Sequence, residues 1–264
     1  MTTTGDPLLE ALGTLREPSE RLTDRVISRW IRVEQGPTGP VYAAWTDRGV
    51  SYLRTAEDVE DDPELFTNRY RERFERPVVE APVPPSGLLS ALRSGRTGAI
   101  PLDLRGLTEF QRQVLEATRG IPRGEFRAYG WVAAAIGRPK AVRAVGSALA
   151  NNPVPLLIPC HRVTLSDASP GQYVFGAETK LRLLGQEQAN LDEVHALAAR
   201  GVRYLGSDST GVVCVPSCRN ARRITPGHRR EFGTLRASLD AGYRACRHCR
   251  PDAALSGPTG PAGN

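Results

Sequence analysis

The alternation of hydrophobic and polar residues predicts a β-hairpin and then a helix in the first third of the chain. Two short apolar runs, residues 41–45 and 49–53, flank a polar Thr-Asp-Arg turn, as the strands of a hairpin do. The Asp-Asp-Pro sequence that follows is typical of a helix start. An aromatic residue then recurs at every fourth position (Phe66, Tyr70 and Phe74), which gives this helix one apolar face for core packing.

The middle of the chain predicts a connector followed mainly by helices. Residues 76–86 are proline-rich and predict the connector, after which Ser86 can cap a short helix. A Thr-x-x-Gln capping box at residues 108–111 begins a longer helix. Residues 130–136 and 139–150 predict two helices across a glycine-containing turn, which is a helix-turn-helix arrangement. By shape alone, the second of these helices fits either a partner helix or a DNA groove.

The segment of residues 152–159 is apolar and interrupted by prolines, so it predicts a buried extended segment rather than a helix. It should deliver Cys160 and His161 out of the core, and a further helix is expected over residues 178–188. A thiol attacks only as the thiolate, which a neighbouring base or cation favours. Taken alone, this pair also fits an inert buried cysteine beside an ordinary histidine.

Composition and charge narrow the class of protein. The 264 residues carry a formal net charge of +6, which favours a polyanionic partner, and Lys140 and Lys180 are the only lysines. The N-terminus lacks the pattern of a signal peptide, and no stretch approaches the ~18 apolar residues of a membrane span. We therefore expect a cytoplasmic protein with no membrane partner. Five cysteines in a reducing compartment favour catalysis or metal binding over disulfides.

Four of the five cysteines have the spacing of a metal site. Cys214 and Cys218 form a Cys-x-x-x-Cys motif, and Cys246 and Cys249 form a Cys-x-x-Cys motif. Four soft sulfur ligands suit tetrahedral zinc. We therefore expect one zinc ion, which would contribute much of the folding energy of this short arginine-rich module.

The motif Pro-Cys-His-Arg-Val at residues 159–163 resembles the signature of the O6-alkylguanine-DNA alkyltransferase family. The resemblance extends over about residues 40–190, and its motifs occur in the family's order. The further matching positions are Phe110-Gln111, Val114, Ile121-Pro122, Gly124, Tyr129, Arg143-Ala144-Val145-Gly146, Asn152-Pro153, Lys180, Leu183-Leu184 and Glu187.

This resemblance implies a role for each matching site residue. Cys160 would accept the alkyl group, and His161 would act as its base through a water, with Glu187 orienting the imidazole. Asn152 would steady the turn before the cysteine. Tyr129 would press on the phosphate backbone of DNA, and Arg143 would enter the stack in place of the flipped base. Lys140, which lies outside the matching positions, is also expected to contact DNA from the second helix of the helix-turn-helix. Tyr173, Val174 and Phe175 would line the substrate pocket.

One departure from the family lies in this pocket. After Tyr173 the family usually has a small residue and two glycines, whereas this chain has Val174-Phe175-Gly176. A bulky Phe175 would either narrow the pocket or point outward on a rearranged loop. The range of alkyl adducts that the protein accepts is therefore left open.

The cysteine-rich end, residues 210–218 and 242–251, resembles the zinc domain of the Ada type. In that domain the first zinc cysteine accepts a methyl group from a DNA phosphotriester, a role that would fall to Cys214. This chain has Val215 where the motif usually has arginine, its domain order is reversed, and no activator helices follow. A structural or DNA-anchoring zinc module, phosphotriester repair and a degenerate remnant therefore all stay open.

The resemblance implies an α/β fold with a small RNase H-like N-terminal domain built on a three-stranded sheet, a helical active-site domain with the helix-turn-helix, and a C-terminal zinc module. We expect a loosely helical lead-in over residues 1–37, the N-terminal subdomain over 38–105, the active-site domain over 106–190, the zinc domain over 200–252 and a disordered tail over 253–264.

The expected activity is single-turnover transfer of an alkyl group from O6-alkylguanine, with O4-alkylthymine as a further substrate, in double-stranded DNA. The expected protein is a nucleoid-associated monomer. Two alternatives stay open: a non-catalytic protein that binds the lesion and recruits other repair, and an alkylation-sensing regulator.

Overall fold

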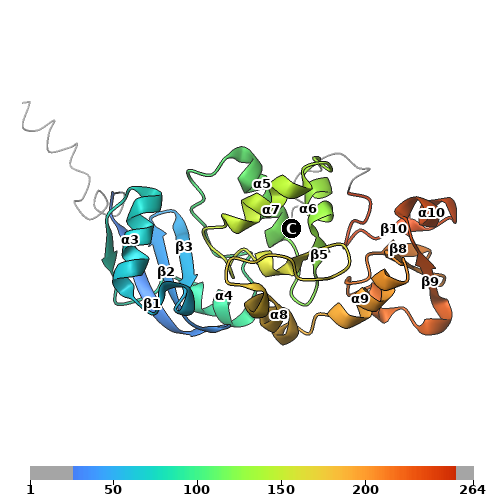
Figure 1. Cartoon of the computed structure of the whole chain (residues 1–264), viewed down its shortest axis with the longest axis horizontal. Coiled ribbons are helices and arrows are strands. Elements are labelled where there is room, and N and C mark those ends of the chain that lie inside the picture. The colour runs from blue at the N-terminus through green and yellow to red at the C-terminus, as the bar shows by residue number, and fades with distance from the viewer. Residues whose placement is uncertain (1–25, 254–264) are drawn as a thin grey trace, which may run out of the picture.

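The computed structural model describes residues 26–253, which form three units in a row along the long axis of the molecule (Figure 1). These are an N-terminal sheet unit, a central helical unit and a C-terminal zinc module. Most of the expected lead-in and nearly all of the expected tail lie outside the described residues. Within residues 26–253, no helix combines the length and the hydropathy needed to span a membrane.

The N-terminal unit is built on a four-stranded sheet with the strand order β3-β2-β1-β4. The strands are β1 (Ser28–Gly36), β2 (Gly39–Thr46), β3 (Gly49–Thr55) and β4 (Val78–Glu80). The predicted hairpin is confirmed as β2 and β3, which pair antiparallel. Two predictions were wrong: β1 lies in the expected lead-in, and β4 lies in the expected connector and adds a fourth strand, parallel to β1.

Helix α3 (Pro63–Phe74) packs on this sheet through its aromatic face, as its four-residue period predicts. The Asp62 side chain caps the helix by accepting the backbone N–H of Glu64 at 2.8 Å. Phe66 and Tyr70 are fully buried among the aromatic side chains of the sheet. These aromatic side chains form a core of the sheet unit that is separate from the main core.

The helical unit contains five helices and a short parallel pair of strands. They are α4 (Leu88–Ser94), α5 (Glu109–Arg119), β5 (Arg127–Ala128), α6 (Tyr129–Ala135), α7 (Val142–Ala150), β6 (Val163–Thr164) and α8 (Ala177–Gln186). The capping box of α5 is confirmed. The N-cap of α4 is Gly87 rather than the predicted Ser86. Helix α7 begins at Val142 rather than at residue 139, because residues 138–141 form a hydrogen-bonded turn.

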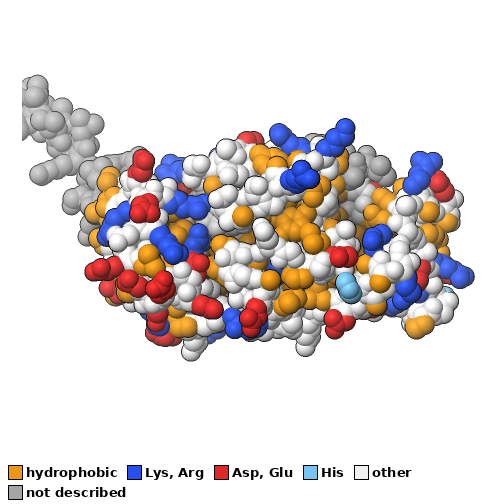
Figure 2. Space-filling model, viewed as in Figure 1, with side chains coloured by type: hydrophobic (Ala, Val, Ile, Leu, Met, Phe, Trp, Pro, Cys, Tyr) orange, Lys and Arg blue, Asp and Glu red, His pale blue; other side chains and the backbone are white. Residues whose placement is uncertain are grey.

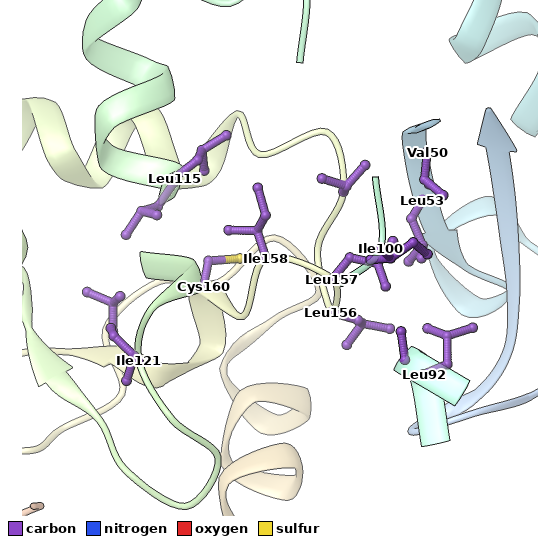
Figure 3. Close-up of a cluster of buried hydrophobic side chains, with 14 of the residues drawn as sticks. Val50, Leu53, Leu92, Ile100, Leu115, Ile121, Leu156, Leu157, Ile158 and Cys160 are labelled. Atoms are coloured by element: carbon purple, nitrogen blue, oxygen red, sulfur yellow. The ribbon is translucent and has the colours of Figure 1, made fainter. Parts of the chain in front are cut away.

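The segment of residues 152–159 runs through the main core from the sheet unit to Cys160, as Figure 3 shows. Its start is joined to β3, because Leu53 donates its backbone N–H to the carbonyl of Pro153 at 2.9 Å. Leu157 and Ile158 are fully buried. The extended buried segment is thus confirmed, but the core also encloses Cys160, which begins a 3-10 turn instead of leaving the core.

The zinc module follows a helix that the sequence did not predict, α9 (Leu191–Ala199). Its sheet has the order β10-β8-β7-β9. The elements are β7 (Tyr204–Ser207), β8 (Val212–Cys214), β9 (Arg229–Phe232), α10 (Leu235–Asp240) and β10 (Arg244–Ala245). The α/β fold with a helix-turn-helix and a small cysteine-rich module is confirmed.

Candidate active site and zinc centre

A cavity of about 690 Å³ opens in front of Cys160 in the helical unit. Tyr129, at the start of α6, and Arg143, on α7, form part of its wall. The loop before α8 forms another part through Tyr173 and Val174. The fold therefore places Cys160 at a mostly apolar cavity beside the helix-turn-helix. Figure 2 shows hydrophobic side chains gathered on the middle of the molecule.

Asn152 holds the cysteine in place. Its side-chain amide donates to the carbonyl of Ile158 at 3.0 Å and to Cys160 Sγ at 3.2 Å, and its Oδ1 accepts the backbone N–H of Val154 at 3.0 Å. Burial raises the pKa of the Cys160 thiol, whereas the Asn152 hydrogen bond and the charge of Lys180 lower it. Asn152 therefore both shapes the turn and favours the thiolate.

His161 and Glu187 meet as the sequence predicts. His161 Nε2 lies 3.2 Å from Glu187 Oε1, and both side chains are buried. Burial lowers the pKa of His161, and Glu187 opposes this shift. The other ring nitrogen, Nδ1, is buried and makes no hydrogen bond with any described residue. His161 is therefore present chiefly as the neutral imidazole, and its Nδ1 is free to accept a proton.

Arg162 belongs to the site, but the sequence analysis assigned it no role. Its guanidinium binds both carboxylate oxygens of Glu187, at 2.7 and 3.0 Å, and Gly124 donates its backbone N–H to the same group. Burial raises the pKa of Glu187, but the hydrogen bonds and charges of His161 and Arg162 outweigh it and lower the pKa to about 2. The ionised carboxylate therefore stabilises the fold above pH 4.5, and this contribution is lost as the pH falls towards 2.

Lys180 is a second residue whose role the sequence did not reveal, although it belongs to the matching pattern. The side chain is fully buried, and Nζ donates to the carbonyls of Val163 and Gln172. It also lies 5.7 Å from the centre of the Tyr129 ring. Burial lowers the pKa of Lys180 to about 8. Besides the family match, a lysine in the apolar stripe of α8 was the signal for this position.

The residues expected to contact DNA lie at the mouth of the cavity or near it. Arg143 is exposed, and the Tyr129 hydroxyl donates to the carbonyl of Gln172 at 3.2 Å. Lys140 is exposed in the turn before α7 and does not line the cavity. Val142 and Leu165, which the sequence did not single out, form an exposed apolar rim.

The pocket wall differs from expectation at Phe175. Tyr173 is partly buried, and its buried hydroxyl makes no hydrogen bond with any described residue. Val174 lines the cavity, but Phe175 does not. The Phe175 ring instead packs edge-on against Tyr173, with ring centres 5.6 Å apart. Phe175 therefore supports the wall from behind and does not fill the space in front of Cys160.

The four remaining cysteines converge as the spacing predicts. Their sulfur atoms lie within 4.8 Å of one another, and all four residues are buried. Asn220 donates to two of them, with its backbone N–H to Cys218 Sγ at 3.4 Å and its side-chain amide to Cys246 Sγ at 3.5 Å. Four buried thiolates with such outer hydrogen bonds fit tetrahedral zinc, and the four cysteines form a zinc site.

Cys214 also borders a second cavity, of about 510 Å³, on the surface of the zinc module. Arg223, His228 and Arg244 line this cavity together with several hydroxyl side chains. A cysteine of the zinc site therefore borders a basic hollow, which suits a phosphate group.

Together, the buried Cys-His-Glu arrangement beside a helix-turn-helix and the four-cysteine zinc module define a DNA-binding protein with a cysteine nucleophile. Residues 109–189 match the family model of the 6-O-methylguanine DNA methyltransferase DNA-binding domain. Residues 194–252 match the metal-binding domain of Ada. A methylated-DNA–protein-cysteine methyltransferase of Methanosarcina barkeri is 34% identical over 161 residues, which are 60% of this chain and 96% of that protein. The chain belongs to the methylated-DNA–protein-cysteine methyltransferase family, as the sequence motifs indicate.

Two further similar proteins show how much of this chain and of each relative the similarity covers. The bifunctional transcriptional activator and DNA repair enzyme Ada of Escherichia coli is 50% identical over 91 residues, which are 34% of this chain but only 25% of Ada. The structure of the Mycobacterium tuberculosis O6-methylguanine methyltransferase is similar with a TM-score of 0.50 and 32% identity, over 61% of this chain and 93% of that one. The matched region thus spans a quarter of Ada and nearly all of the Methanosarcina barkeri and Mycobacterium tuberculosis proteins.

Proposed function

We propose that this protein repairs DNA by transferring an alkyl group from O6-alkylguanine in duplex DNA to Cys160 Sγ, once per molecule. The observation that carries the proposal is the position of Cys160 at the cavity. The next residue, His161, lies 3.2 Å from the carboxylate of Glu187. O4-alkylthymine, which presents the same kind of alkyl–oxygen bond, is the further substrate that we propose. We also propose that the protein acts as a monomer on the nucleoid in the cytoplasm. Its net charge of +6 favours a polyanionic partner such as DNA.

The chemistry uses the groups that surround the cavity. His161 Nδ1 takes the thiol proton through a water, and the charged Glu187 stabilises the imidazolium that forms. The sulfur of Cys160 then bonds to the alkyl carbon, and the bond from that carbon to O6 breaks. Its electron pair stays on guanine, which takes up a proton. We propose that the Tyr173 hydroxyl, which makes no hydrogen bond with any described residue, donates one to the base.

The base must leave the DNA stack to reach Cys160, because a duplex hides O6 of guanine. We propose that Arg143 fills the space left by the base while Tyr129 presses on the backbone phosphate, with Lys140 adding a phosphate contact nearby. Most contacts would then be to the backbone, so binding should depend on salt more than on sequence. The product is a thioether, which we expect to persist, so each molecule acts once.

The direct test is mass spectrometry of the protein and its peptides after incubation with a duplex that contains O6-methylguanine. We expect one added methyl group, on the peptide that contains Cys160. The same duplex without the lesion is the control and should leave this peptide unchanged. An unmodified Cys160 in a folded, zinc-loaded sample would contradict the proposal.

Lys180→Met is expected to slow alkyl transfer about tenfold at pH 7, equivalent to a rise of about one unit in the thiol pKa. Lys180 is charged at this pH because its pKa is about 8, and its charge favours the Cys160 thiolate. The transfer rate should also begin to increase at a higher pH in the variant than in the wild type. Single-turnover rates across pH test this, with the exposed Arg71→Met as the control. An unchanged pH profile would rule out an electrostatic role for Lys180.

We propose as a second activity that Cys214 accepts a methyl group from a DNA methyl phosphotriester. The basic cavity beside this sulfur favours it, because phosphate oxygens would lie among Arg223, His228 and Arg244. A duplex with a single methyl phosphotriester should methylate the Cys214 peptide in the wild type but not in Arg223→Ala/Arg244→Ala. Methylation of the Cys160 peptide by O6-methylguanine should persist in that variant. No methyl on Cys214 would leave the zinc site with a purely structural role.

A further inference from the structure

The zinc module is hydrogen-bonded directly to the first helix of the helix-turn-helix. Trp131, on α6, donates its Nε1–H to the carbonyls of Cys249, at 2.9 Å, and of Arg250, at 3.2 Å. Cys249 is one of the four zinc cysteines, and α6 begins at Tyr129, which lines the Cys160 cavity. Figure 1 shows the ribbon of the zinc module passing beside α6. One helix therefore connects the backbone of a zinc ligand with the wall of the alkyl-acceptor site.

A buried polar cluster joins the two units beside this helix. Glu125, which is 1% exposed, lies 2.7 Å from His248 Nε2 and accepts from Arg127 at 2.6 Å. Arg127 also donates to Ser217 Oγ at 3.2 Å, and its guanidinium lies 5.5 Å from the ring centre of Trp131. His248 and Ser217 each precede a zinc cysteine in the chain. The contact of Glu125 with His248 and the bond of Arg127 to Ser217 persist only while the zinc loops hold their positions.

A second contact reaches the other side of the active site. Arg222, in the turn after the first pair of zinc cysteines, donates to the carbonyl of Gln188 at 3.1 Å. Gln188 follows Glu187, the carboxylate that binds His161. Gly124 lies close against this segment, because a Cβ added there would lie 2.7 Å from the Glu187 carbonyl oxygen. The zinc module thus contacts both segments that present the site residues.

We infer that the zinc site braces the alkyltransferase site. The metal fixes the loops of Cys218 and Cys249, and these loops hold α6 and the segment after Glu187 through Trp131, Glu125 and Arg222. These three are positioning residues, since none of them lines the Cys160 cavity. Coupling of this kind is reciprocal, so the same contacts must raise the affinity of the module for zinc. If the zinc module were joined to the helical unit only by the polypeptide at α9, zinc would not support the active site and these contacts would not raise the zinc affinity.

The coupling can be measured on the full chain without DNA, so the result does not depend on the alkyl transfer proposed above. Trp131→Phe keeps the ring and removes the donor, and Glu125→Gln removes the buried charge. Trp45→Phe is the matched control, because Trp45 lies in the sheet unit. Zinc affinity is measured by competition with a chromophoric chelator, and hydrogen exchange of residues 127–135 and 183–188 is followed with and without zinc.

We expect Trp131→Phe to weaken zinc binding about fivefold, the effect of one lost hydrogen bond, and Glu125→Gln to weaken it about tenfold. Zinc removal from the wild type should speed exchange in both segments, while Trp45→Phe should behave as the wild type does. Unchanged zinc affinity in both interface variants would overturn the inference. So would unchanged exchange in both segments when the wild type loses zinc, and this measurement needs no variant that folds.

Discussion

Replacing Cys160 with alanine should abolish alkyl transfer and leave the affinity for duplex DNA within about twofold. The sulfur is the only atom in the proposed mechanism that bonds to the alkyl carbon. Its loss leaves Asn152 with its bond to the Ile158 carbonyl, so the turn should persist at a cost of about 1 kcal/mol or less. Fluorescence anisotropy with a lesion-containing duplex measures binding, and peptide mass spectrometry measures transfer.

This variant also separates the proposed enzyme from a protein that only binds the lesion. A non-catalytic binder would give equal binding and no methylated peptide in both the wild type and Cys160→Ala. The intact contacts of Cys160 with Asn152 and of His161 with Glu187 favour the enzyme, because a binding protein has no need of them. Removal of the methyl group from DNA O6-methylguanine by Cys160→Ala would contradict the assignment of the acceptor.

The parts of the fold that the sequence predicted are those with a strong local pattern. The hairpin of β2 and β3 and the aromatic period of α3 depend on neighbours in the chain, so their residues were sufficient. Strand β1 was missed because Arg29, Arg32 and Glu34 interrupt its apolar positions, although it forms the centre of the sheet. Its strand state depends on pairing with both neighbours, which a local pattern does not contain.

The same distinction applies to the candidate site. Cys160, His161 and the zinc cysteines were predicted from motifs with fixed spacing. Arg162 and Lys180 were present in the sequence, but their roles depend on contacts with Glu187 and with carbonyls far along the chain. The bond between Trp131 and the Cys249 carbonyl spans 118 residues, and no spacing rule predicts it.

Removing zinc, by a strong chelator or by Cys249→Ser, should unfold the zinc module. Its buried apolar cluster comprises eight residues, and four of them are the zinc cysteines themselves. Without the metal, little apolar area remains to offset the conformational entropy of about fifty residues. Structural zinc contributes on the order of 10 kcal/mol in small modules, which exceeds what such a core supplies. Hydrogen exchange over residues 204–253 should therefore lose its protection.

Cys160→Ser is the matched control for this experiment, because it also exchanges a buried thiol for a hydroxyl but lies outside the zinc site. It should keep one zinc ion and full protection in residues 204–253, whereas Cys249→Ser should lose both. The N-terminal sheet should stay protected in either variant, since its aromatic core does not involve the zinc module. Protection that survives in a metal-free module would mean that packing against α6 and α9, and not the metal, holds it folded.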